Sequence, residues 1–451
     1  MAPSVIILAA GKGTRMEADL PKVLHQVGGA PMLLHVLQTT IRIEPEHIIL
    51  VTGHGAEAVE VAAKAYDDTI KVVLQQEQKG TAHAVLQAKT ALTDARGDTI
   101  VLYGDTPFVR SETLLALLEA RRSADIVVLG FEAADPKRYG RLVMQDNKLT
   151  RIVEYKDANA AERAISLCNS GVLCADSDVL FSLLGAVDNN NAAGEYYLTD
   201  IVQLANERNL NVTALHCDEA ETMGVNSRAE LVNAEALFQT TARAELMDRG
   251  VTLQAPETVY LAFDTVIGRD THIEPNVVFG TSVTLENNTR IRAFSHLEGC
   301  HVSSGAVVGP YARLRPGTEL AENVRVGNFV EVKNAQIEQG AKVNHLSYIG
   351  DASIGEASNI GAGTVTCNYD GVSKHYTEIG RSVFIGSNTM LVAPVKIGDG
   401  AMTASGSVIT KDVDPGALAV ARAEQKNKSG LANKLFTMLR NKRARQQKDA
   451  K

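Results

Sequence analysis

The chain has 451 residues and a formal net charge of −8 at pH 7. This length exceeds one ordinary hydrophobic core, and the acidic balance argues against nucleic-acid binding. No apolar run approaches the roughly 20 residues that a membrane helix needs, so we expect no membrane partner. The five cysteines never form a C-x-x-C pair, which favours a reducing, cytoplasmic location over a disulfide framework.

Short apolar strands alternate with helical segments from residue 1 to residue 225. This alternation predicts βαβ units on a mostly parallel sheet, a Rossmann-like α/β domain whose ligand binds at the carboxyl ends of the strands. The predicted strands cover residues 5–8, 48–51, 72–74, 99–102 and 126–130, and the clearest helices cover 31–43 and 111–122.

A single long helix is predicted over residues 226–250, as a linker. Ser227 and Glu230 have the spacing of a capping box, and Gly250 is a helix stop.

The C-terminal half, residues 251–451, is dominated by a six-residue repeat of apolar side chains. A helix repeats near 3.6 residues and a strand alternates by two, so neither explains this period. Stacked coils of short strands do, and the repeat predicts a parallel β-helix. The repeat positions are Ile267, Ile273, Phe279, Leu285, Ile291, Leu297, Val308, Leu314, Leu320, Val326, Val332, Ile337, Val343, Ile349, Ile354, Ile360, Thr366, Ile379, Ile385, Leu391 and Ile397.

The last stretch, residues 426–451, carries nine Lys and Arg against one Asp. We expect a short helix over 431–439 and a frayed basic end. The tail is either only solvated or reaches the phosphates of a ligand, and the sequence leaves both open.

The first strand runs into a glycine-rich loop. Residues 8–16 read L-A-A-G-K-G-T-R-M, and residues 21–22 read P-K. Small residues let the backbone approach phosphates closely, while Arg15 and Lys22 supply charge for a triphosphate and a leaving pyrophosphate. An isolated Gly-x-Gly is usually an ordinary turn. The full string closely resembles the signature of sugar-phosphate nucleotidyltransferases.

Further short motifs follow in the same half. They read Q-Q-E-Q-K-G-T at 75–81, Y-G-D at 103–105, Y-G-R at 139–141, I-V-E at 152–154, N-S-G at 169–171 and G-V-N at 224–226. Their order and spacing resemble the uridylyltransferase half of the bifunctional enzymes that make UDP-N-acetylglucosamine, a precursor of peptidoglycan and lipopolysaccharide.

That resemblance implies UTP as a co-substrate and Mg²⁺ as a cofactor, with Arg15 and Lys22 as the catalytic residues of this half. The implied nucleotide contacts are Leu8, Ala9, Gly11, Lys22, Gln75, Gln78, Gly80, Thr81 and Tyr103. The implied sugar contacts are Gly140, Glu154, Asn169 and Asn226, and the implied metal ligands are Asp105 and Asn226.

Charged side chains and one imidazole interrupt the six-residue repeat, which a pure scaffold does not need. The repeat also breaks between Thr366 and Ile379, where an insertion predicts an external loop. A lone histidine in a β-helix is usually a surface residue. The strings R-L-R-P-G at 313–317, G-N-F-V-E-V-K at 327–333, H-L-S-Y-I-G-D at 345–351 and N-I-G-A-G-T-V-T-C-N-Y-D-G at 359–371 strongly resemble the acetyltransferase half of the same family.

This second resemblance implies a left-handed β-helix, a homotrimer with acetyl-transfer sites between subunits, and acetyl-CoA as co-substrate. His345 suits the general base because its ordinary pKa lies near the working pH, and Glu331 would orient its ring. Arg315 and Lys333 suit a sugar phosphate, and Tyr348 and Asn359 complete the glucosamine 1-phosphate site. Residues assigned to acetyl-CoA are Ala362, Asn368, Tyr369, Ser387, Ser405 and Arg422, of which Asn368 and Tyr369 also border the sugar. Val343-Asn344, beside the histidine, is bulkier and more polar than expected.

The favoured interpretation is a bifunctional enzyme with a uridylyltransferase domain at 1–225, a linker helix at 226–250 and an acetyltransferase domain at 251–451. One alternative is a monofunctional sugar-nucleotide pyrophosphorylase that uses its β-helix only to oligomerise. A structural platform is a second alternative, but it leaves the glycine-rich loop unexplained.

Overall fold

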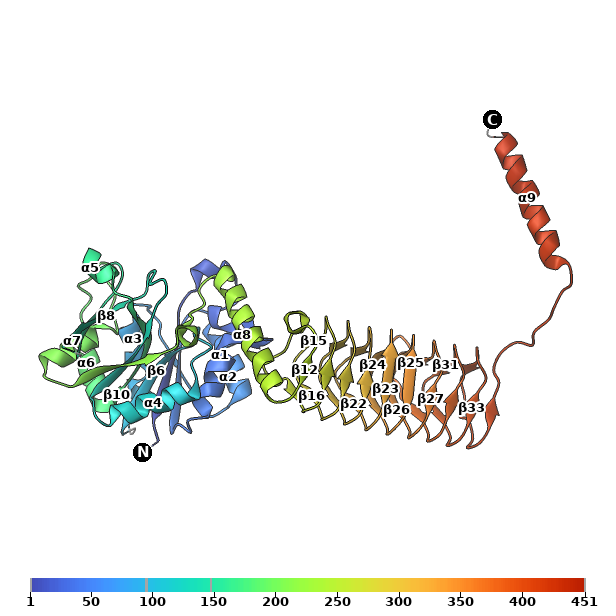
Figure 1. Ribbon diagram of the computed structural model, residues 1–451, viewed down its shortest axis with the longest axis horizontal. Helices are drawn as coiled ribbons and strands as arrows, with labels where there is room; N and C mark the ends of the chain where they lie inside the picture. The colour runs from blue at the N-terminus through green and yellow to red at the C-terminus, as the bar shows by residue number, and fades with distance from the viewer. Residues whose placement is uncertain (1, 94–95, 147, 450–451) are drawn as a thin grey trace. The chain divides into compact units, whose positions relative to one another are not determined.

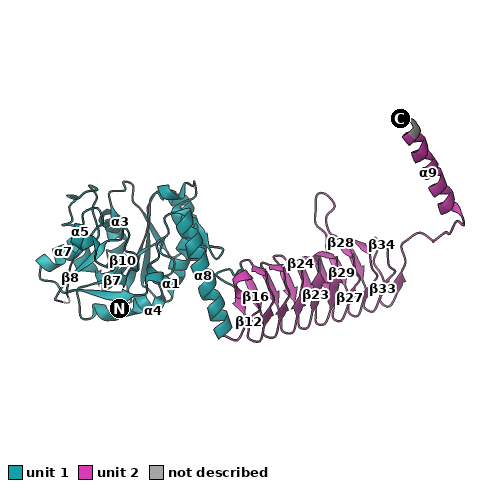
Figure 2. Ribbon diagram, turned by 45° about the horizontal axis from the view of Figure 1, so that its top comes forward, with its two compact units in different colours: residues 1–248, 260–265 teal, residues 249–259, 266–451 magenta. Residues whose placement is uncertain are grey.

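The computed structural model describes residues 2–93, 96–146 and 148–449 and divides into two compact units (Figure 2). Unit 1 comprises Met1–Asp248 and Tyr260–Thr265, and unit 2 comprises Arg249–Val259 and Val266–Lys451. The predicted linker helix is α8 (Arg228–Asp248), which belongs to unit 1. Its capping box is modified: Ser227 Oγ accepts from the Glu230 N–H at 3.3 Å, but the Glu230 carboxylate accepts from the Asn226 N–H at 2.7 Å. The functional domain limits stay a prediction.

Unit 1 is built on a sheet with helices on both faces (Figure 1). Each of the five strands predicted from the sequence lies within an observed strand. The strands of the sheet are β1 (Ser4–Ala9), β4 (His47–Thr52), β5 (Lys71–Leu74), β6 (Asp98–Tyr103), β7 (Ile126–Glu132), β8 (Arg141–Gln145), β9 (Lys148–Val153), β10 (Leu167–Asp176) and β11 (Val212–Cys217). The other elements are α1 (Met32–Ile41), α2 (Ala56–Tyr66), α3 (Thr81–Gln87), α4 (Ser111–Arg121), α5 (Ala160–Arg163), α6 (Ser177–Leu184), α7 (Asp200–Glu207) and the small hairpin of β2 (Gln26–Val27) and β3 (Ala30–Pro31).

The strand order β11-β7-β10-β6-β1-β4-β5 places β1 between β4 and β6 and parallel to both. Successive side chains of β1 enter two different cores: Ile6 and Leu8 pack on one face, and Val5 and Ile7 on the other. Burial on both faces explains why the strand is a continuous apolar run. Leu8 pairs with Tyr103, so the glycine-rich loop and the Y-G-D motif leave the same edge of the sheet.

The sheet is mixed where the sequence analysis anticipated mainly parallel pairing. β10 is antiparallel to both β6 and β7, and β8 and β9 form a hairpin beside it. Only two residues separate β8 from β9, and a connection this short allows antiparallel pairing but not a parallel crossover.

Unit 2 is a prism of short parallel strands stacked coil upon coil (Figure 1). Its fold is the parallel β-helix predicted from the repeat, and it is left-handed, as the resemblance implied. One sheet contains β12 (Thr252–Leu253), β14 (His272–Ile273), β17 (Arg290–Ile291), β20 (Val307–Val308), β23 (Arg325–Asn328), β25 (Lys342–His345), β27 (Asn359–Ile360), β30 (Phe384–Ile385), β33 (Met402–Thr403) and β35 (Leu418–Ala419).

The other sheet covers the remaining faces, which the two long strands β24 and β26 join. It contains β13 (Val266–Ile267), β15 (Val278–Phe279), β16 (Val283–Leu285), β18 (His296–Leu297), β19 (Cys300–Val302), β21 (Arg313–Leu314), β22 (Thr318–Leu320), β24 (Glu331–Ile337), β26 (Tyr348–Ile354), β28 (Val365–Cys367), β29 (Thr377–Ile379), β31 (Met390–Val392), β32 (Val395–Ile397) and β34 (Val408–Ile409).

The repeat positions form the interior of the prism. Every one of them, from Ile267 to Ile397, is buried, and Thr366 replaces an apolar side chain by bonding within the stack. Thr366 Oγ1 accepts from the Gly350 N–H at 2.8 Å. The predicted insertion lies between β28 and β29, as a loop outside the coils. The repeat side chains of each coil are thus buried in the interior by stacking on those of the neighbouring coils.

The basic tail differs from the prediction. Helix α9 (Leu431–Asp449) continues well beyond residue 439, so the segment expected to be frayed is helical. Its Arg, Lys, Gln and Ala residues are good helix formers, which accounts for the extension. Within the described ranges, no helix combines the length and the apolar character that crossing a membrane requires.

Candidate functional sites

Unit 1 contains a cavity of about 590 Å³ at the carboxyl ends of β1 and β6. Its lining includes every residue of this half that was predicted to contact the nucleotide, the sugar or the metal. These residues are Leu8, Ala9, Gly11, Lys22, Gln75, Gln78, Gly80, Thr81, Tyr103, Asp105, Gly140, Glu154, Asn169 and Asn226. Arg15 is not in this lining; it is exposed, on a 3₁₀ helix at Thr14–Met16. The structure therefore brings together motifs that lie far apart along the chain.

Lys22 sits against the glycine-rich loop. Gly13 has φ +59°, and a Cβ on it would lie 2.7 Å from Cβ of Lys22, so only glycine lets the loop close onto the lysine stem. The Lys22 ammonium contacts the Asp105 carboxylate and donates to Asn226 Oδ1 at 3.0 Å. The side chains of Lys22 and Asp105 are each 14% exposed.

The two predicted metal ligands are held together by the backbone. The Val225 N–H donates to the Asp105 carbonyl at 3.0 Å, which joins the loop after β6 to the loop before α8. One carboxylate and one amide oxygen thus face the same point, and both are the hard oxygen donors that Mg²⁺ prefers.

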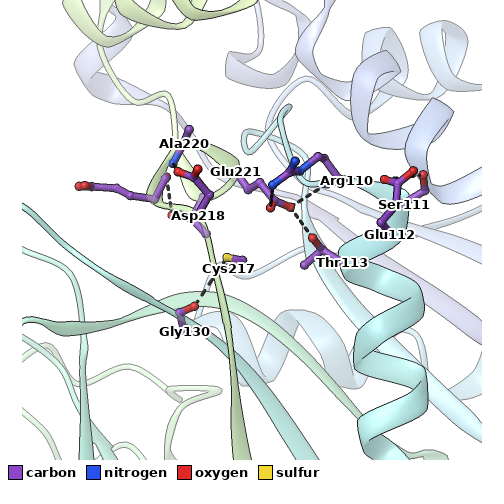
Figure 3. Close-up of polar contacts among 11 residues, drawn as sticks. Arg110, Ser111, Glu112, Thr113, Gly130, Cys217, Asp218, Ala220 and Glu221 are labelled. Atoms are coloured by element: carbon purple, nitrogen blue, oxygen red, sulfur yellow. Dashed lines mark hydrogen bonds and ion pairs between the residues drawn. The ribbon is translucent and has the colours of Figure 1, made fainter. Parts of the chain in front are cut away.

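Glu221 anchors the loop that carries Asn226, through contacts that sequence reasoning missed (Figure 3). Its carboxylate is buried and accepts from Arg110 Nη2 at 2.5 Å, from Thr113 Oγ1 at 2.6 Å and from the Arg110 N–H at 3.2 Å. Arg110 and Thr113 belong to the start of α4, which follows the Asp105 loop. Glu221 therefore ties both ligand-bearing loops to one helix end.

The part of the cavity lined by the predicted sugar contacts contains a buried acid, Glu154. Burial raises the pKa of Glu154, and its neighbour Asp200 adds to the rise; Thr199 Oγ1 donates to Glu154 Oε1 at 3.3 Å and acts against it. Gly140 and Asn169 are joined by a backbone bond of 2.9 Å. Arg138 also lines the cavity, whereas the neighbouring Arg141, part of the Y-G-R motif, is buried and donates to the carbonyl oxygens of Lys137 and Tyr139. The sequence offers no signal that separates these two arginines.

The loop at 75–81 is braced from within. Gln78 Nε2 donates to the Ala10 carbonyl at 3.0 Å, and Gln75 Nε2 donates to the Gly80 carbonyl at 3.1 Å. Gly80 has φ +119°, and a Cβ there would lie 2.4 Å from the Tyr196 carbonyl oxygen, so this position requires glycine. Thr81 Oγ1 accepts from the Leu198 N–H at 2.9 Å. Hydrogen bonds therefore hold the loop at 75–81 in place as one wall of the cavity.

In unit 2 three cations lie close together: Arg315 directly after β21, Lys333 on β24 and Lys374 in the insertion loop. Lys333 lies against Lys374, whose charge lowers the pKa of Lys333, and Arg315 adds to the effect. The Nε of Arg315 is buried and has no hydrogen-bond partner among the described residues. Cations brought this close to one another point to an anionic ligand. Arg315 and Lys333 were expected from the sequence, whereas Lys374, which lies in the predicted insertion, was not.

The insertion loop is anchored beside these cations. Asn368 Nδ2 donates to Asp351 at 2.5 Å, and Asn334 Nδ2 donates to the same carboxylate at 2.6 Å. Burial acts to raise the pKa of Asp351, but these hydrogen bonds and the nearby lysines lower it overall. Tyr369, 61% exposed, pairs with Lys374 across the loop.

His345 is exposed at the end of β25, and its contact differs from the expected one. Its Nδ1 lies 2.8 Å from Asn328 Oδ1, on the preceding coil. Glu331, expected to orient this ring, instead accepts from Arg315 Nη1 at 2.8 Å. The carboxylate is drawn to the full charge of the guanidinium beside it, and the neutral amide of Asn328 takes the position next to the imidazole.

Ala362, Ser387 and Ser405, which were assigned to acetyl-CoA, follow His345 along the prism, whereas Asn368 and Tyr369 lie in the insertion loop. The register Val343–Ile360–Ile385–Thr403 aligns His345 with Ala362, Ser387 and Ser405 on successive coils. Arg422 Nη1 donates to the Ser405 carbonyl at 2.9 Å, which places its guanidinium at the same column. Ala362, Ser387 and Ser405 thus form a straight column of small side chains between His345 and Arg422.

Val343 is an interior repeat position and is fully buried, so it does not face a ligand on the surface; Asn344 packs its backbone against Gly327. Tyr348 begins β26, next to Glu331 in the register, and Asn359 begins β27, next to Lys342.

Family models match both units. A model described as "MobA-like NTP transferase domain" matches residues 5–169, and one described as "Bacterial transferase hexapeptide (six repeats)" matches residues 264–299 and 376–411. The first range contains the glycine-rich loop and most of the unit 1 cavity. The second contains coils on both sides of the histidine.

Relatives with the printed name "Bifunctional protein GlmU" match almost end to end. The protein of Ruegeria pomeroyi is 66% identical and covers 100% of both chains. That of Ruegeria sp. strain TM1040 is 65% identical over 98% of this chain and 99% of its own. That of Roseobacter denitrificans is 63% identical over 99% and 100%.

Proposed function

The chain belongs to the family of bifunctional GlmU proteins, and from this premise we propose which reaction each unit performs. Unit 2 transfers the acetyl group of acetyl-CoA to the amine of glucosamine 1-phosphate. Unit 1 transfers the uridylyl group of UTP to N-acetylglucosamine 1-phosphate and releases pyrophosphate. The product, UDP-N-acetylglucosamine, feeds peptidoglycan and lipopolysaccharide precursors. The observation that carries the proposal is the convergence of the predicted nucleotide, sugar and metal residues on one cavity.

In the uridylyl transfer the nucleophile is already an anion. The phosphate of the sugar attacks the α-phosphorus of UTP, so the chain needs no general base and contributes position and charge. Lys22 and Arg15 act on the phosphates of UTP and on the departing pyrophosphate. Gly140, Glu154 and Asn169 hold the sugar, and the braced wall around Gln75 and Gly80 holds the uracil.

Asp105 and Asn226 are the residues that would hold Mg²⁺. Their oxygen donors suit this ion, and the contact of the Lys22 ammonium with the same two oxygens supports a position of favourable potential for a cation. When bound, Mg²⁺ would neutralise phosphate charge in this step.

In the acetyl transfer His345 is the general base. If Asn328 Oδ1 accepts the Nδ1–H, the ring presents Nε2 as the acceptor for the proton of the attacking amine. The amine nitrogen forms a bond to the thioester carbonyl carbon, the carbon–sulfur bond breaks, and coenzyme A leaves. Arg315, Lys333 and Lys374 hold the sugar phosphate, and Glu331 balances the charge of Arg315.

A homotrimer is part of the proposal, and a ladder of exposed side chains supports it. Phe294, Tyr311, Phe329 and Leu346 occupy the same corner of four successive coils, each with φ between +53° and +59° and each about half exposed or more. The three rings stack at 4.8 and 5.2 Å between centroids. Bulky residues at positive φ are costly, and other coils place Asn276, Gly363 or Asn388 there.

We call these four residues the corner ladder. It separates His345, on one face of the prism, from Tyr348 and Glu331 on the next face. Side chains on two faces of a convex edge diverge, so a wall from a second copy packed on the ladder would complete the pocket. The cytoplasmic location stays a prediction from the sequence.

A two-stage assay tests the assignment. The full chain is incubated with acetyl-CoA and glucosamine 1-phosphate while thiol release is followed; UTP and Mg²⁺ are then added while pyrophosphate is followed. Both signals are expected. Pyrophosphate release alone, with N-acetylglucosamine 1-phosphate supplied, would instead support a monofunctional pyrophosphorylase. The absence of both signals would contradict both assignments.

A further inference from the structure

The ammonium of Lys22 lies where the two predicted metal ligands converge. It contacts the Asp105 carboxylate and donates to Asn226 Oδ1 at 3.0 Å. These residues lie 83 and 204 positions from Lys22 in the chain, so the arrangement is made by the fold. A lysine ammonium is a compact point charge with three donors and no acceptor, and here it serves the oxygens as a cation would.

This position is built rather than incidental. The stem of Lys22 is packed under Gly13, whose backbone at φ +59° leaves no room for a Cβ. The Val225–Asp105 backbone bond and the Glu221 anchor hold the two oxygen donors in place. The Asp105 side chain is only 14% exposed, and a carboxylate so far removed from water needs a counter-charge.

The same two oxygens cannot serve two cations at once. A divalent ion that takes both donors must displace the ammonium, because like charges at contact distance repel strongly in a partly buried site. The displaced ammonium then requires another anion. The glycine-rich loop that Lys22 packs against is the loop proposed to hold the phosphates of the nucleotide, so a long, flexible lysine stem can exchange one anionic partner for the other.

We propose that Lys22 is the resident counter-ion of Asp105 and Asn226, and that it excludes divalent cations from these ligands until nucleotide phosphates draw its ammonium away. This inference rests on the proposed function of unit 1. It makes metal and nucleotide binding mutually dependent, with each favouring the other by the same factor. Metal alone therefore binds weakly, and the site binds the divalent cation tightly only when the nucleotide is present.

The test measures metal binding without nucleotide. Mn²⁺, which shares the oxygen preference of Mg²⁺, is titrated into the full chain and followed by electron paramagnetic resonance. Lys22→Met is expected to bind Mn²⁺ about tenfold more tightly than wild type, an increase that corresponds to one ion-pair partner removed. Lys12→Met, which removes a charge from the same loop but lacks the contact with Asp105, is the matched control and is expected to leave the affinity unchanged. Asp105→Asn in the Lys22→Met background is expected to abolish the gain.

Equal or weaker Mn²⁺ binding by Lys22→Met, with an unchanged melting temperature, would overturn the inference. Should Lys22→Met fold poorly, Lys22→Gln removes the same charge and retains a polar end, and the same comparison applies. The Mn²⁺ assay does not depend on turnover. When wild type carries out Mg²⁺-dependent uridylyl transfer but Lys22→Met shows no gain in Mn²⁺ affinity, only the counter-ion role is rejected. Absence of uridylyl transfer in wild type rejects the proposed function, whatever the Mn²⁺ result.

Discussion

At the residue scale, the chemistry of a ligand restricts which side chains can serve it, and the residues that motif reasoning predicted for the unit 1 ligands line one cavity, with Arg15 outside it. Phosphates call for small residues and cations, and Mg²⁺ calls for oxygen donors. The partners of those side chains were harder to anticipate. Asn328 beside His345 and Glu221 behind Asn226 are supplied by the stacking of coils and by the packing of α4, which no local pattern encodes.

Glu221→Gln tests the positioning of Asn226. The amide keeps the volume but loses the charge that pairs with Arg110, so the loop loosens and the Asn226 side-chain oxygen, proposed to bind the metal, shifts. We expect the Mg²⁺ concentration that gives half-maximal uridylyl transfer to rise about tenfold, in line with the effect of removing supports around metal ligands, with a smaller change in the KM for UTP. A change in melting temperature without a change in Mg²⁺ dependence would reduce Glu221 to a purely structural role.

Asp200 provides a pH-dependent prediction. Burial, followed by Asp188 and Asp157, raises its pKa from 3.8 to about 6. Because the folded state holds the proton more tightly than the unfolded state, stability falls as pH rises from 3.8 through 6, and the loss is complete above 6. Asp200→Asn removes this charge and is expected to raise the melting temperature by about 2–4 °C at pH 7.5. The gain is expected to shrink at pH 5, and scanning calorimetry at both pH values checks this; a gain independent of pH would contradict the assignment.

At the element scale, periodicity decided the prism and the strands of unit 1. A repeat of six admits neither a helix nor a simple strand, so the buried positions followed directly. Elements without such a signature were missed: β10 and the β8–β9 hairpin pair antiparallel, and α9 extends past the predicted end. The antiparallel pairing depends on strands that are distant in the sequence, so no local repeat records it. The extension of α9 depends on the helix propensity of its residues, which gives no periodic apolar pattern.

The corner ladder gives a prediction at this scale. Tyr311→Asn together with Phe329→Asn replaces bulky residues at positive φ by the residue that other corners use, so each coil should be locally relieved. We nevertheless expect trimer dissociation in sedimentation velocity and at least a tenfold loss of acetyl transfer, while uridylyl transfer stays within about twofold. Val61→Asn, an exposed apolar residue on α2 of unit 1, is the control. An intact trimer in the double variant would place the interface elsewhere.

At the scale of the whole molecule, two units carry separate sets of the residues proposed to act in the two reactions. The unit 1 set, except for Arg15, lines one cavity, and the unit 2 set lies on the prism and its insertion loop. Two reactions on separate units should fail separately when single residues are changed.

His345→Ala and Arg15→Ala form a reciprocal pair. Loss of the general base is expected to reduce acetyl transfer by at least about 10²-fold and to spare uridylyl transfer. Arg15→Ala is expected to reduce uridylyl transfer sharply, because charge on the leaving pyrophosphate is less well neutralised, and to spare acetyl transfer. Separate assays of thiol and pyrophosphate release check both, and near-normal turnover by either variant in its own reaction would contradict the role given to that residue.

The sequence by itself determined the fold class of both halves and the residue types proposed for each site, because periodicity and ligand chemistry are local properties. Only the tertiary structure decided which of those residues meet. Lys22 reaches Asp105 and Asn226 because β1 lies beside β6 and because the loop before α8 bonds to the loop after β6. Long-range pairing of this kind depends on how whole elements pack, and a string of residues carries no direct record of it.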